Sequence, residues 1–493
     1  MSQARPNVLF VMVDQWPGHL LGLAGHPVIE TPTLDWLARL GTVYPKAYSE
    51  CPICIPARRT VMTGTSPRRH GDRVFQPAAP MPKLPTLAQS FRDAGYQATA
   101  VGKLHVYPQR DRIGFDEALI AEEGRPQLGA VDDYDLFLAD RGHGGAQFLH
   151  AMGNNDYVWR PWHLAEDCHV TNWTTWAMAR EIKRRDPTRP AFWHLSYTHP
   201  HPPLVPLASY LERYRGREID LPVGADWSAD FEALPYALKT VRGFWPALDE
   251  TRLADVRRAF YALCTHIDHQ LRVVIGTLRE ENLLDDTVIL VTGDHGDMLG
   301  DHGLYAKRLF YEGSAGVPMI LVGAAGDGRV PAGRRDPRLV GLADVMPTLL
   351  DLAGIDRPET CEGLSMVGEK THEIFYGEAL EGAKAMRMVH DGRHKLIWYP
   401  AGNRVQLFDL AEDPKEQSDL AEDQSASDVR RRLETALIER LYGEDLGWVD
   451  GGRLIGMAAP DFTPGADRGL AGQRGLHFPQ PPLSQPGRVV GTP

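Results

Sequence analysis

The sequence lacks the features that mark several classes of protein. None of its apolar runs approaches the length of a membrane span, and lysine and arginine form no long basic run. The formal net charge is −12, with 65 acidic against 53 basic side chains. Binding to nucleic-acid phosphates or to an anionic membrane needs clustered positive charge. We therefore expect no nucleic-acid and no membrane partner, and an anionic substrate would need a local positive site.

Cysteine is scarce and odd in number. Its five residues are scattered over a chain of 493, unlike the framework of a disulfide-stabilised secreted protein. The first apolar stretch, Val8 to Val13, is too short for the core of a signal peptide. It is followed by Asp14 rather than by the small residues of a cleavage site. These features predict a reducing compartment and a cytoplasmic location.

What the chain does contain is a regular alternation of apolar strands and helical segments. This order is typical of an α/β sandwich with a mainly parallel central sheet. Polar residues follow each strand, and in such sheets ligand sites form beyond the carboxyl ends of the strands. The expected strands are residues 7–13, 97–101, 191–197 and 287–292, and the expected helices are 33–40, 86–94, 170–185 and 251–283.

The pattern changes near residue 373, where short strand-like pieces are followed by a charged helix at about 425–441. We expect a large domain at 1–372 and a smaller C-terminal α+β domain at 373–450. Residues 451–493 are rich in glycine and proline and have little periodicity. This tail is predicted to be an arm that packs against a neighbouring subunit of a homo-oligomer.

A reactive segment is indicated by Cys54-Ile-Pro-Ala-Arg58, followed by Arg-Thr-Val-Met-Thr-Gly64. It sets a thiol at a predicted helix start with Pro56 in the first turn, where a helix favours anions. A buried structural thiol is the alternative interpretation. The segment resembles the signature of the type I sulfatase family of the alkaline phosphatase superfamily, in which this cysteine is oxidised to formylglycine.

The resemblance implies an alkaline-phosphatase-like α/β/α sandwich and a formylglycine-generating enzyme, or an equivalent, that matures Cys54. A hydrated aldehyde carries two hydroxyl groups on one carbon. One can attack a sulfate ester, and the other can collapse the adduct. The resemblance therefore implies a covalent mechanism with this residue as the nucleophile.

A cation site is predicted from Asp14 and Gln15 after the first strand and from Asp294 and His295 after the last. Two carboxylates, an amide oxygen and an imidazole can hold one divalent ion. By resemblance these four are metal ligands, joined by the formylglycine at Cys54, and the imidazole leaves both Ca²⁺ and Mn²⁺ open. Alternatively, the two aspartates only cap loops. Three nearby polar residues are expected to be loop scaffold: Asp297, Asp301 and His302.

Sulfate ester cleavage also needs cations for the sulfate oxygens and a proton donor for the leaving group. Gly-Lys103-Leu-His105, Pro-His201-Pro-Pro and the segment that contains Lys307 resemble family motifs. By resemblance, His201 and Lys307 contact the leaving oxygen and the sulfate, and His105 holds the second formylglycine hydroxyl. Arg58 and Lys103 would orient the formylglycine. The identity of the proton donor stays open among His201, Lys307 and His105.

We predict a hydrolase of small-molecule sulfate monoesters, similar to arylsulfatases and promiscuous toward phosphate and phosphonate esters. A phosphonate monoester hydrolase or phosphodiesterase with the same nucleophile is the alternative within the enzymes. Such hydrolases tend to carry uncharged residues where this chain has Lys103 and His105, which favours sulfate. A non-catalytic anion-binding protein with unmodified Cys54 is the alternative from another class.

Overall fold

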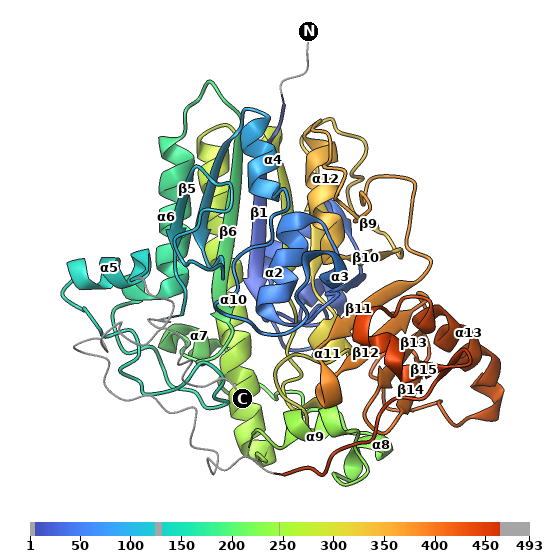
Figure 1. The fold of residues 1–493 in the computed structure, drawn as a ribbon. Coiled ribbons are helices and arrows are strands. Elements are labelled where there is room, and N and C mark those ends of the chain that lie inside the picture. The colour runs from blue at the N-terminus through green and yellow to red at the C-terminus, as the bar shows by residue number, and fades with distance from the viewer. Residues whose placement is uncertain (1–4, 124–130, 246, 464–493) are drawn as a thin grey trace.

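The structure is a computed structural model that describes residues 5–123, 131–245 and 247–463 (Figure 1). A mixed eight-stranded sheet forms its centre, in the order β5-β4-β6-β1-β7-β8-β2-β9. β8 runs antiparallel to both of its neighbours, whereas the remaining pairs are parallel. The strands are β1 (Asn7–Asp14), β2 (Thr42–Val43), β4 (Gln97–Gly102), β5 (Glu117–Ile120), β6 (Ala191–Pro200), β7 (Thr287–Gly293), β8 (Met319–Val322) and β9 (Arg334–Arg335).

Strand β1 is buried on both faces, which explains why its sequence is apolar without alternation. Leu9 and Val11 point into one hydrophobic core, and Val8 and Phe10 point into another on the opposite face. Figure 1 shows helices on both sides of the sheet. The first core is covered by α1 (Pro32–Leu40), α6 (Val170–Arg184) and α10 (Glu250–Glu280), and the second by α2 (Cys54–Thr63), α4 (Leu87–Asp93) and α12 (Val345–Leu352).

The predicted α/β fold with a mainly parallel sheet is confirmed. The four expected strands correspond to β1, β4, β6 and β7, and the four expected helices to α1, α4, α6 and α10. The antiparallel β8 was not predicted, because a short apolar strand does not reveal its direction. No helix in the described part of the chain has the length and apolar character needed to cross a membrane. Shorter helices are α3 (Pro67–His70), α5 (Asp133–Asp140), α7 (Ala208–Arg213), α8 (Asp226–Ala229), α9 (Tyr236–Arg242) and α11 (Glu312–Ala315).

The C-terminal region contains a four-stranded antiparallel sheet of order β11-β12-β13-β14. One face of this sheet packs on α13 (Ser427–Ile438), and the other shares a core with the larger domain. Lys395, in β13, is buried at this junction, where its Nζ donates to Phe310 O and Glu416 Oε1, both at 2.9 Å, and also pairs with Glu312. The strands are β11 (Phe375–Ala379), β12 (Met386–His390), β13 (His394–Tyr399) and β14 (Arg404–Asp409).

Two short pairs complete the described strands, and the second of them lies where the predicted arm begins. They involve β3 (Lys46–Tyr48) with β10 (Leu339–Gly341) and β15 (Val449–Asp450) with β16 (Arg453–Leu454), besides the β2 and β9 pair of the central sheet. Phe462 lies edge-on to Phe231 of the same chain, with ring centroids 5.3 Å apart. Most of the predicted arm, residues 464–493, lies outside the described residues, so the homo-oligomer stays a prediction.

His194 in β6 makes stability sensitive to acid. Its ring stacks between Phe10 and Phe115, and burial, followed by the charge of Arg58, lowers its pKa from 6.5 to about 3. Between these values the unfolded chain binds a proton that the folded protein does not, so stability is lost as pH falls below 6.5. When the pH is lowered from 8 to 5, the free energy of unfolding of the His194→Phe variant should therefore rise by about 2 kcal/mol relative to that of the unsubstituted protein. Urea unfolding at the two pH values measures this difference. A pH-independent difference between the two proteins would contradict this.

Candidate active site

The predicted site residues lie where the strands of the central sheet end. Asp14 is the last residue of β1, Lys103 follows β4, His201 follows β6, and Asp294 follows β7. Because these strands are parallel neighbours, their carboxyl ends meet at one edge of the sheet. The ten predicted residues are brought together there, and none is more than 7% exposed: Asp14, Gln15, Cys54, Arg58, Lys103, His105, His201, Asp294, His295 and Lys307.

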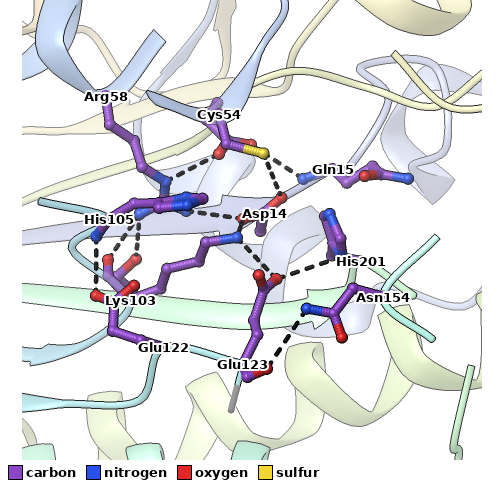
Figure 2. Close-up of polar contacts among 12 residues, drawn as sticks. Asp14, Gln15, Cys54, Arg58, Lys103, His105, Glu122, Glu123, Asn154 and His201 are labelled. Carbon is purple, nitrogen blue, oxygen red and sulfur yellow. Dashed lines mark hydrogen bonds and ion pairs between the residues drawn. The ribbon is translucent and has the colours of Figure 1, made fainter. Parts of the chain in front are cut away.

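Cys54 is the first residue of helix α2, as its sequence context predicts. Its Sγ lies 3.1 Å from His295 Nε2. It also lies 3.9 Å from Asp14 Oδ1, and Figure 2 shows this contact with Asp14. Burial raises the pKa of the thiol, but the charges of Lys307, Lys103 and His295 outweigh it and hold this pKa well below its ordinary value. The environment therefore favours an anion at Cys54.

Cys51, three residues earlier, has the opposite environment. It is fully buried, and burial followed by the nearby carboxylates of Asp72 and Glu378 raises the pKa of its thiol well above the ordinary value. Its Sγ contacts Arg73 O at 3.7 Å. The two cysteines are therefore chemically distinct although they lie in the same segment.

A buried cluster around Cys54 has the donors needed for a cation. One ligand atom each from Asp14, Cys54, Asp294 and His295 lie within 4.8 Å of one another. Burial and then the charge of Asp14 raise the pKa of Asp294. Two adjacent buried carboxylates repel each other, and a divalent cation between them would relieve that repulsion. The donor chemistry of this cluster therefore fits a divalent metal ion.

Arg58 binds the carboxylates of this cluster rather than facing an open space. Its Nε lies 3.0 Å from Asp294 Oδ2, and its Nη2 lies 3.3 Å from Asp14 Oδ2. Its Nη1 donates to Lys103 O at 2.7 Å and to Ser196 Oγ at 2.9 Å. The guanidinium thereby links helix α2 to the ends of β1, β4, β6 and β7.

Lys103 bridges two acidic side chains. Its Nζ pairs with Asp14 Oδ2 and lies 2.7 Å from Glu123 Oε1, as Figure 2 shows. Glu122 fixes the following turn, because its Oε1 accepts the backbone N–H groups of Leu104 and His105, both at 2.8 Å. Burial raises the pKa of Glu122 to about 7 despite these bonds. Lys103 and His105 are thus held at the site by carboxylates from the segment after β5.

His201 and Lys307 reach the site from two different segments of the chain. His201 Nδ1 lies 2.7 Å from Pro202 O and 3.3 Å from Glu123 Oε1. Because both partners are acceptors, Nδ1 carries a hydrogen, which leaves Nε2 for proton transfer. Lys307 Nζ donates to Gln15 Oε1 at 2.7 Å.

Several residues near the site carry no recognisable sequence motif. Asp297, which was expected to be loop scaffold, contacts Gln15 directly. Of these residues, only Glu122 and Glu123 could have been found from the sequence. They closely follow the edge strand β5, as other site residues follow their strands. The structure adds five residues that were not predicted to contact the site: Glu122, Glu123, Tyr157, Ser196 and Asp297.

Comparisons with known proteins identify the relatives of this chain. The family model "Sulfatase" matches residues 6–355, and a model for the C-terminal region of N-sulphoglucosamine sulphohydrolase matches residues 300–442. An arylsulfatase of Clostridium perfringens is 33% identical over 92% of this chain and 97% of its own. A choline-sulfatase of Rhizobium meliloti is 32% identical over 86% and 83%. The crystal structure of a phosphonate monoester hydrolase of Agrobacterium radiobacter shares the fold, with a TM-score of 0.77 at 24% identity, over 90% of this chain and 98% of that chain.

Proposed function

The chain belongs to the sulfatase family and is a sulfuric ester hydrolase, and we propose that it cleaves sulfate monoesters through a formylglycine formed from Cys54. One observation carries this mechanism. The Cys54 Sγ, which stands where the formylglycine hydroxyls would be, lies in the same 4.8 Å cluster as atoms of Asp14, Asp294 and His295. Maturation requires a formylglycine-generating enzyme or an equivalent. A cytoplasmic location and a homo-oligomer stay predictions.

Asp14, Asp294 and His295, together with Gln15, would hold one divalent cation, either Ca²⁺ or Mn²⁺. When bound, such an ion supplies positive charge that stabilises the deprotonated form of the attacking hydroxyl. The hydroxyl oxygen forms a bond to sulfur, and the bond from sulfur to the ester oxygen breaks. Loss of the proton from the second hydroxyl then forms the C=O bond of the aldehyde while the bond from that carbon to the sulfate oxygen breaks, which releases sulfate, and water adds to the aldehyde to restore the two hydroxyls.

Three cationic or protonated side chains surround the reacting atoms in this proposal. Lys103 and Lys307 bind the sulfate oxygens, where charge must be stabilised as the leaving group departs. His201 donates a proton from Nε2 to the leaving oxygen, because its Nδ1 is occupied by Pro202 O and Glu123. His105 accepts the proton of the second hydroxyl.

The leaving group would occupy a pocket beside His201. Its exposed walls are mainly apolar, and no lysine or arginine is among the described residues that line it. An uncharged aryl or alkyl group therefore fits better than a multiply sulfated sugar, whose further anions would lie near Glu123. The apolar walls are formed by Phe148, Trp162, Val170, Pro202, Pro203 and Val205.

A panel of nitrophenyl esters tests the proposed substrate class. We expect kcat/KM for 4-nitrophenyl sulfate to exceed that for the phenylphosphonate ester by roughly tenfold or more, equivalent to about 1.4 kcal/mol in transition-state binding. The expectation rests on Lys103 and His105, because phosphonate monoester hydrolases tend to carry uncharged residues there. A reversed ranking with the same preparation would favour the phosphonate monoester hydrolase alternative.

A further inference from the structure

Asp297 lies in the loop between β7 and α11 and uses both oxygens of its buried carboxylate. Its Oδ2 accepts hydrogen bonds from Gln15 Nε2 and from the Tyr157 hydroxyl, each at 2.5 Å. Its Oδ1 accepts the backbone N–H groups of Leu299 at 2.9 Å and Ala306 at 3.0 Å. All four neighbours donate, so Asp297 acts as an acceptor only.

These contacts determine which way the Gln15 amide points. The nitrogen faces Asp297, and the oxygen accepts a hydrogen bond from Lys307 Nζ at 2.7 Å. The reversed amide would set an oxygen against the carboxylate and an NH₂ group against the ammonium. Gln15 is only 1% exposed, so solvent could not compensate for the two lost hydrogen bonds.

The same carboxylate also fixes the loop that carries Lys307. Ala306 and Arg308, on either side of this lysine, have φ values of 57° and 80°, in the left-handed region that non-glycine residues rarely adopt. Such a backbone needs external contacts to persist. Ala306 N–H is bound by Asp297, and Arg308 N–H donates to Pro52 O at 2.9 Å, next to the nucleophile segment.

Tyr157 is rigid enough to orient Asp297 in turn. Its ring packs edge-on against Trp245, with centroids 5.6 Å apart, and in a tilted arrangement against Tyr305, with centroids 5.0 Å apart. The side chain is buried, so its hydroxyl has a fixed direction toward Asp297. A residue from a connection without any motif is thereby linked to the cation site through two hydrogen bonds.

We propose that Asp297 and Tyr157 are positioning residues that hold the Gln15 amide with its oxygen toward Lys307, the orientation in which that oxygen could serve as a cation ligand. This inference rests on the proposed function, because it assigns to Gln15 the role of a cation ligand. Without the Asp297 carboxylate, the amide can reverse and present its NH₂ group to the cation, which repels it. Substitution of a residue that hydrogen-bonds to a metal ligand typically lowers metal affinity by about 10- to 100-fold.

Titration calorimetry of the full-length protein with Ca²⁺ and with Mn²⁺, after removal of bound metal, tests this role. Asp297→Asn should weaken binding by about 10- to 100-fold. Tyr157→Phe, which removes one of two donors to the same oxygen, should weaken it roughly threefold. Asp301→Asn is a matched control, because Asp301 lies in the same loop and bonds Val223 N–H and Arg257 rather than Gln15. The Asp301→Asn variant should bind Ca²⁺ and Mn²⁺ with the same affinity as the unsubstituted protein.

Repeating the Asp297→Asn substitution in a Gln15→Glu protein distinguishes two roles of Asp297, orientation of the Gln15 amide and stabilisation of the loop that carries Lys307. In a Gln15→Glu background, Asp297→Asn should cause no loss of affinity, because a glutamate carboxylate presents an oxygen to the cation whichever way it is turned, and the asparagine NH₂ group can donate to its other oxygen. An equal loss in both backgrounds, or no loss in either, would overturn the positioning role. If the unsubstituted protein binds neither ion, the proposed cation site itself fails, and this inference fails with it.

Discussion

Cys54→Ala should abolish sulfate ester hydrolysis while the protein remains folded. Loss of a covalent nucleophile typically lowers kcat by about 10⁴-fold or more. The substitution removes one sulfur atom from the first turn of α2, and none of the contacts that hold Arg58 to Asp14 and Asp294 involves that atom. The measurement is kcat/KM for 4-nitrophenyl sulfate, with circular dichroism to verify the fold.

Cys51→Ala is the matched control, because the two thiols lie three residues apart and both are buried. Its high pKa and its place away from the cation cluster predict near-normal turnover. Peptide mass spectrometry should show loss of sulfur at Cys54 and an intact thiol at Cys51. An active protein with an unmodified Cys54 would rule out formylglycine, and an inactive one would favour the non-catalytic anion-binding alternative.

Arg58→Met should lower the free energy of unfolding by about 3–5 kcal/mol when no divalent cation is present. The reason is that methionine fills much of the same space but leaves the carboxylates of Asp14 and Asp294 buried without their shared cationic partner. Urea unfolding at neutral pH measures this change. The loss should shrink when Ca²⁺ or Mn²⁺ is added, because a bound ion neutralises the same two carboxylates.

Arg92→Met provides the comparison for this experiment. Arg92 pairs with Asp93 at 3.3 Å, but the two side chains are 39% and 59% exposed, and solvent-exposed pairs contribute little to stability. We expect no measurable change from it. If Arg58→Met is equally silent, or if added cation leaves its loss unchanged, then Arg58 does not act by balancing the charge of the two aspartates.

The parts of the fold that the sequence predicts are those set by local pattern. Runs such as Val8 to Val13 are apolar at every position, which only a strand covered on both faces explains. The site residues at the strand ends follow from the same pattern, because parallel neighbours bring Asp14 and Asp294 to one edge. Cys54 was found because its signature is contiguous in the chain.

The residues that escaped prediction act through contacts between distant segments. Tyr157 reaches Asp297 across 140 positions, and no local pattern distinguishes it from other tyrosines in long connections. Arg58 was predicted to be a site residue that orients the formylglycine, but its contacts with two carboxylates were not predicted, because they depend on the packing of α2 against the sheet. Contacts of this kind depend on the tertiary arrangement, which residue spacing does not encode.

The buried Lys395 at the junction of the two sheets has a consequence for inheritance and engineering. It anchors Phe310 O and Glu312, which closely follow Lys307 in the chain, from a strand of the C-terminal sheet. The small domain is therefore not an interchangeable module, because exchanging it for a homologous one would move the backbone that presents Lys307. A functional chimera would have to exchange the loop and the C-terminal sheet together, as a single inherited unit.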